Sequence, residues 1–168
     1  MAEMILETLI RLPNAWSGVA GRYGVHLFEG RLTVADMDRM EAIGDQWHAR
    51  NPGRLVEMVV IFPSSARLDD AERQRLVRLV ARREKARAAS ATVILADGMV
   101  GAMQRSMLTG INLIRRPPHP VKVFSTVSDA VSWLLPYVRE AVERTTGRLE
   151  MLAATEDFCA SFRQRGSS

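Results

Sequence analysis

Apolar residues follow two patterns along the chain: short continuous runs that are typical of buried strands, and stripes that recur every three to four residues, as in helices. The continuous runs lie at residues 25–30, 54–62, 90–97 and 121–126. A segment with helical spacing follows each run, so strand and helix alternate four times. This order predicts an α/β fold with a four-to-five-stranded, mostly parallel sheet and helices packed on it.

Polar residues and glycines indicate where these elements begin. Thr33 and Asp36 have the spacing of a capping box, which predicts the start of the first helix. The second helix is expected to begin near Asp69, where acidic side chains complement the helix dipole. Glycines punctuate residues 15–27, which suggests an additional antiparallel strand ahead of the first run.

The later helices carry glycine and proline signals. The third helix is expected to end at Gly110, and one side of it carries an apolar stripe that includes Met103, Met107 and Ile111. Residues 115–120 are rich in arginine and proline and are interpreted as a connector, because proline cannot continue a helix. Pro136 is expected to kink or restart the fourth helix.

One more amphipathic helix follows Gly147. We therefore expect a single domain at residues 1–140, with its core at about 16–136, and a C-terminal helical extension at residues 141–168 with a short disordered end. The apolar stripe of this extension has to be buried against the body of the domain or against a second copy. A homodimer through the C-terminal helix is therefore one of the two alternatives.

Composition restricts the class of protein. The chain has 168 residues, of which 47% are hydrophobic and 25% charged, as in soluble globular proteins. No apolar run approaches the roughly 20 residues of a membrane span, and the N-terminus lacks the basic start of a signal peptide. Its single cysteine, Cys159, fits a reducing compartment. We expect a cytoplasmic protein.

Positive charge is concentrated at residues 73–87, which hold seven basic residues and one acidic residue. Such a strip is able to attract nucleic acid. It is more often the solvated face of a helix, and aromatic residues for base stacking are scarce there. We therefore do not expect a nucleic-acid partner.

The sequence holds no motif for catalysis, metal binding or cofactor binding. The three histidines, His26, His48 and His119, lack metal-ligand spacing, and Cys159 has no partner for a zinc site. Cys159 lies on an apolar stripe, which is typical of a buried thiol. We therefore predict no enzyme activity, no metal and no cofactor.

Two strand-to-helix turns remain as candidate sites. Gly98 and Gly101 would expose backbone N–H groups to a small anion or a nucleotide phosphate, although tight turns use glycine in any case. Ser64 and Ser65 lie between a buried strand and the helix that begins near Asp69. The helix dipole would stabilise a phosphate added there, and a role as turn or capping serines also explains them.

Three segments carry a family resemblance: GRLTVADMDRM at residues 30–40, MVVIFPSSARLDDAERQRL at 58–76, and SMLTGINLIRRPPHPVKVFSTVSDAVSWL at 106–134. They resemble bacterial STAS-like proteins, the sulfate-transporter and anti-sigma-factor-antagonist domains, over about residues 16–136. The third segment is the most specific, and the C-terminal helix lies outside the resemblance.

This resemblance implies a domain without enzyme activity that docks to protein partners, such as a serine-kinase anti-sigma regulator. In phospho-switched members, a serine of an Asp-Ser-Ser-Gly turn is phosphorylated at the start of a helix. Ser64 and Ser65 stand at the matching junction, with Pro63 in place of the aspartate and Ala66 in place of the glycine. We predict a regulatory protein-interaction domain that uses residues 63–70 and 97–102. The alternative is a domain that binds a small anion or nucleotide at residues 97–102.

Overall fold

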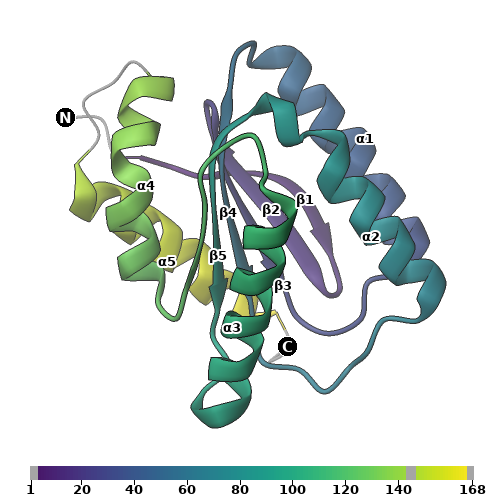
Figure 1. The fold of residues 1–168 in the computed structure, drawn as a ribbon. Coiled ribbons are helices and arrows are strands. Elements are labelled where there is room, and N and C mark those ends of the chain that lie inside the picture. The colour runs from purple at the N-terminus through teal and green to yellow at the C-terminus, as the bar shows by residue number, and fades with distance from the viewer. Residues whose placement is uncertain (1–3, 143–146, 166–168) are drawn as a thin grey trace.

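The computed structural model describes residues 4–142 and 147–165 and contains one six-stranded sheet (Figure 1). The strands lie in the sheet in their order along the chain. They are β1 (Glu7–Leu12), β2 (Ala15–Ala20), β3 (Tyr23–Phe28), β4 (Leu55–Ile61), β5 (Arg87–Ile94) and β6 (Val121–Phe124). Of the chain end expected to be disordered, residues 166–168 lie outside the described residues.

Five α-helices and a short 3-10 helix, η1 (Glu84–Ala86), accompany the sheet in the described residues. The α-helices are α1 (Val34–Arg50), α2 (Asp70–Arg82), α3 (Gly98–Arg115), α4 (Val127–Val142) and α5 (Arg148–Gln164). The pair α1 and α2 covers one face of the sheet, and the pair α4 and α5 covers the other (Figure 1). α3 stands apart from both pairs, and its main contacts with the sheet are with β5 and β6 (Figure 1).

Strand directions confirm the predicted α/β class. β3, β4, β5 and β6 are parallel, and helices connect them. β2 is the predicted antiparallel strand, paired with β3. β1 is a strand that we did not predict, and it pairs antiparallel with β2 through a register shift between Thr8 and Ile10. It is an edge strand with exposed charged side chains at Glu7 and Arg11, so it lacks the continuous apolar run of the central strands.

The main core lies between the sheet and the helices α4 and α5. Leu27 on β3 and Met58 on β4 are fully buried there, together with Leu134 of α4. α5 buries its own apolar stripe in the same core, with Phe158 and Phe162 as its largest contributions. The stripe of the C-terminal helix is therefore covered by the body of the domain.

The basic strip of α2 forms ion pairs with acidic residues of α1. Arg75 donates to Asp38 and Glu41, with nitrogen–oxygen distances of 2.8 and 2.7 Å. Arg83 donates to a carboxylate oxygen of Asp45 at 2.9 Å. These contacts join α1 to α2. They also pair the positive charges of Arg75 and Arg83 with carboxylates, whereas a nucleic-acid surface needs unpaired basic side chains.

Two helices run further than we predicted. α3 passes through Gly110 and ends at Arg115, where Arg116 takes a left-handed conformation with φ of 48°. A single glycine costs a helix only about 1 kcal/mol relative to alanine, so the helical run on both sides of it prevails. α4 continues through Pro136 without restarting.

Candidate functional site

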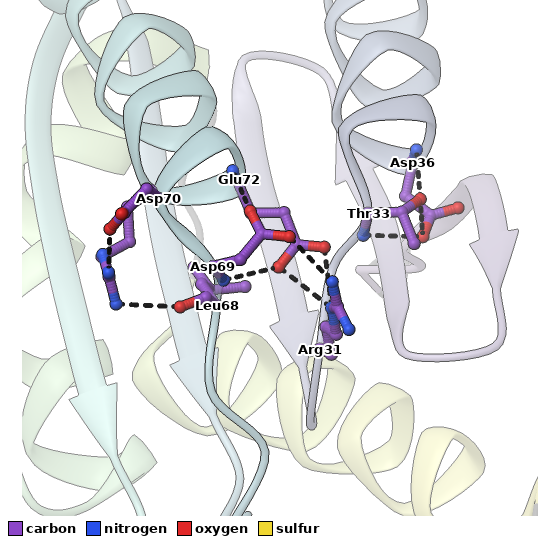
Figure 2. A network of polar contacts seen from close by, with 8 residues as sticks. Arg31, Thr33, Asp36, Leu68, Asp69, Asp70 and Glu72 are labelled. Carbon is purple, nitrogen blue, oxygen red and sulfur yellow. Dashed lines mark hydrogen bonds and ion pairs between the residues drawn. The ribbon is translucent and has the colours of Figure 1, made fainter.

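A polar network fixes the start of α2, the helix that follows the loop with the candidate serines (Figure 2). Asp69 is the N-cap of α2, and its side chain accepts a hydrogen bond from the backbone N–H of Glu72 at 2.9 Å. The Glu72 carboxylate in turn accepts from the backbone N–H of Asp69 at 2.9 Å, which completes a capping box. Arg31 donates to both carboxylates, at 2.7 Å to Glu72 and 2.9 Å to Asp69.

Arg31 also connects this helix start to the start of α1, because Thr33, the N-cap of α1, lies two residues after it. Thr33 and Asp36 form the predicted capping box there, with the backbone N–H of Asp36 donating to Thr33 at 3.1 Å (Figure 2). The backbone N–H of Glu72 and the Arg31 guanidinium lower the pKa of Asp69. The N-terminus of α2 is therefore already occupied by carboxylates of the chain itself.

Ser64 and Ser65 lie outside this network, in an exposed loop between β4 and α2. The hydroxyl of Ser64 accepts a hydrogen bond from the backbone N–H of Ala66 at 3.1 Å, as in a serine turn. Both side chains are accessible from solvent. Of the three predicted residues, the structure places Asp69 at the helix cap and leaves the two serines in the loop before it.

The fold itself requires glycine at both positions of the second candidate turn. Gly98 has a φ of 65°, a conformation that side chains rarely adopt. A methyl group on Gly101 would lie 1.8 Å from the carbonyl oxygen of Ala96, so only glycine lets α3 approach the end of β5. Arg105 closes the same end by donating to the carbonyls of Ile94 and Ala96, each at 3.0 Å. Anion binding at this turn stays a prediction.

The apolar stripe of α3 is exposed. We define the α3 stripe as Met99, Met103, Met107 and Ile111, which follow one another at intervals of four residues. Their side chains are 88%, 65%, 63% and 39% exposed. The sequence pattern placed three of these residues on one apolar side, and such a side usually packs on the core. Here α3 rests on the sheet through other residues, with Gly101 buried and Leu108 and Asn112 half-buried.

Two of the histidines and the cysteine pack within the fold. His26 is half-buried beside Ser17, with its Nδ1 2.9 Å from the serine hydroxyl, and desolvation lowers the pKa of the imidazole. His119 lies in the connection between α3 and β6, and its Nε2 is 2.9 Å from the hydroxyl of Ser90 on β5. Burial raises the pKa of the Cys159 thiol to about 12, so it stays protonated at neutral pH.

Searches for other sites were made over residues 4–142 and 147–165. Within that part of the chain, no group of three or more His, Cys, Asp or Glu residues has the arrangement of a metal site. Nor does any helix there have the length and apolar character to cross a membrane.

A basic hollow of about 470 Å³ lies where the β1–β2 turn meets the end of α5. Arg11, Arg163 and Arg165 line it, and Arg165 is held by Glu29 at 2.6 Å. Sequence reasoning missed this hollow because its residues come from three distant segments, none of which carries a local motif.

Comparisons with known proteins agree with this architecture. No protein-family model and no curated protein matches the chain. A solved structure of an uncharacterised protein from the DUF3478 family with a SpoIIAA-like fold, from Shewanella loihica PV-4, matches it with a TM-score of 0.56. The match has 18% sequence identity and covers 71% of this chain and 91% of that one. Because the identity is this low, the likeness shows the fold. The chain has a SpoIIAA-like fold, which confirms the STAS-like fold predicted from its motifs.

Proposed function

We propose that this chain is a regulatory protein-interaction domain that docks a protein partner through the α3 stripe. The observation that carries this proposal is the exposure of the stripe, because soluble chains rarely present contiguous large apolar side chains without a binding role. Seven large apolar side chains of α3 are between 39% and 88% exposed. The proposed role follows from the site and agrees with a fold that hosts docking in STAS-like proteins.

The composition of α3 favours a protein partner over a membrane surface. Three of the four stripe residues are methionines, whose flexible side chains adapt to protein surfaces. Helices that lie on membranes usually carry aromatic residues and a face rich in free basic side chains. α3 has no aromatic residue, and its two arginines are engaged, Arg105 with strand carbonyls and Arg115 with Glu84.

The loop with Ser64 and Ser65 is the proposed regulator of this docking. β4 and β5 are parallel neighbours, so their carboxyl ends lie at one edge of the sheet. The serine loop follows β4, and α3 begins shortly after β5. A phosphate on either serine would add negative charge near the apolar start of the stripe, which disfavours an apolar interface.

Photo-crosslinking in the native cells tests the docking surface. A photoreactive amino acid replaces Met107 in the α3 stripe, and the same amino acid replaces Ser161, an exposed position on α5, as the control. We expect a discrete protein adduct from position 107 that is absent from position 161. Equal adduct patterns at both positions, or adducts to lipid in place of protein, would overturn the proposal.

A pair of double variants tests the regulatory part. Ser64→Asp with Ser65→Asp mimics the added charge, and Ser64→Ala with Ser65→Ala is its neutral match. We expect the acidic variant to reduce the adduct from position 107 about tenfold, which corresponds to about 1.4 kcal/mol, while the neutral variant keeps it. Equal adduct yields from the two variants would contradict regulation by phosphorylation of the serine loop, but would not contradict the docking surface.

A further inference from the structure

A row of small residues runs beside the α3 stripe with the same spacing. We define the α3 small row as Gly98, Ala102, Ser106 and Gly110, each of which precedes a stripe residue by one position. Residues four apart on a helix form continuous ridges, so α3 presents a ridge of large apolar side chains next to a row of small ones. These two features are shaped to fit each other.

No described residue crowds Gly110. A methyl group built on it meets no atom within 4 Å, and its φ is not in the left-handed region. A glycine inside a helix destabilises that helix relative to alanine, and it usually marks a turn or a close approach. Since the described residues supply neither here, a close approach from another molecule would account for it.

We propose that the protein docked on α3 is a second copy of this chain, an inference that rests on the proposed function. The α3 stripe of one copy packs into the α3 small row of the other, and two-fold symmetry makes the reverse contact as well. Ridges formed by residues four apart pack against each other with helices crossing at about −50°. Ser106, in the middle of α3, then lies near the symmetry axis.

Charges are compatible with this arrangement. All members of the α3 stripe and the α3 small row are uncharged, so two copies do not repel each other at the contact. Antiparallel helices direct the Asp97 end of one α3 toward the Arg116 end of the other, and these charges are opposite. Leu149 is the large apolar residue of α5 that stays exposed, so α3 offers the more extensive apolar surface for self-association.

Filling the small row tests the inference. The Cβ of Gly110→Leu meets no atom of its own chain within 4 Å, and Ser161→Leu on α5 is the matched control. Sedimentation velocity over a concentration series measures the monomer–dimer equilibrium, and circular dichroism confirms that both variants are folded. We expect the original chain and the control to dimerise equally, and Gly110→Leu to raise the dissociation constant at least tenfold. A dimer that Gly110→Leu leaves unchanged would overturn the inference.

A disulfide trap provides the second readout. Ser106→Cys is expected to form a disulfide between copies under mild oxidation, while Ser161→Cys is not. The natural Cys159 is buried, so it gives little background. A chain that stays monomeric up to about 1 mM, with no excess of disulfide at position 106, contradicts the second copy as partner. If the photoreactive amino acid at position 107 crosslinks to a different protein, the proposed function holds and the second copy is ruled out as the partner. If it crosslinks to no protein, both proposals fail.

Discussion

Replacing Gly44 by alanine tests how α1 and α2 are joined. A methyl group at position 44 would lie 1.9 Å from Nη1 of Arg83. That guanidinium donates to the backbone carbonyl of Glu41 at 2.5 Å and to a carboxylate oxygen of Asp45 at 2.9 Å. The arginine side chain is only 13% exposed, so the methyl group has to displace the guanidinium from these acceptors.

The expected cost follows from two opposing effects. Alanine is favoured over glycine inside a helix by about 1 kcal/mol. Hydrogen bonds to charged groups contribute about 1.5–3 kcal/mol, and we take about 2 kcal/mol for the lost pair because the expelled guanidinium regains water. Gly44→Ala should therefore lower the free energy of unfolding by about 1 kcal/mol.

Gly110→Ala is the matched control, because the same methyl group there meets no neighbour within 4 Å. It should raise the free energy of unfolding by about 1 kcal/mol in dilute, monomeric protein. Urea unfolding followed by circular dichroism measures both variants. If Gly44→Ala stabilises the chain as Gly110→Ala does, Arg83 does not occupy the space beside Gly44. In an Arg83→Leu background, Gly44→Ala should lose its destabilising effect.

Three further predictions concern buried and half-buried groups. Thr155 donates to a backbone carbonyl and accepts from Tyr23, so Tyr23→Phe should cost about 1 kcal/mol of unfolding free energy. Thr155→Val should cost more, about 2 kcal/mol, because it leaves the Tyr23 hydroxyl unpaired; equal losses in urea titrations would refute this. Burial lowers the pKa of His26, so the unfolded state binds the proton more tightly and stability should fall as the pH drops below about 6.5. His26→Asn should flatten that slope without abolishing it, since burial lowers the pKa of His119 as well. Cys159 should react with a thiol reagent only as fast as the chain unfolds, and rapid labelling of folded protein would show an accessible thiol.

Local features of this fold could be predicted because they depend on residues close in sequence. The capping box at Thr33 and the helix start at Asp69 were predicted, and each needs only a side chain three residues away. The strands β4 and β5 are covered on both faces for most of their length, so their apolar runs identify them. β1 escaped prediction because an edge strand with exposed Glu7 and Arg11 lacks that signal.

Features that depend on distant residues could not be predicted. The helical pattern of α3 shows that Met103 and Met107 share a side, but it does not show whether the body of the domain covers that side. The carboxylate partners of Arg75 and Arg83 lie 34–38 residues earlier in the sequence, on α1. No local motif distinguishes such a paired arginine strip from a solvated one.

Methionine oxidation tests the central claim most directly, because it reports the exposure of the α3 stripe and its burial on docking. Met103 and Met107 are largely exposed, whereas Met37 and Met58 are fully buried and serve as internal references. In dilute protein, hydrogen peroxide should oxidise the two stripe residues much faster than the two references, as followed by mass spectrometry. At concentrations where the chain dimerises, the stripe residues should become protected while the references do not change. Slow oxidation of the stripe in dilute protein would contradict the docking surface itself, and fast oxidation at every concentration would contradict a second copy as the partner.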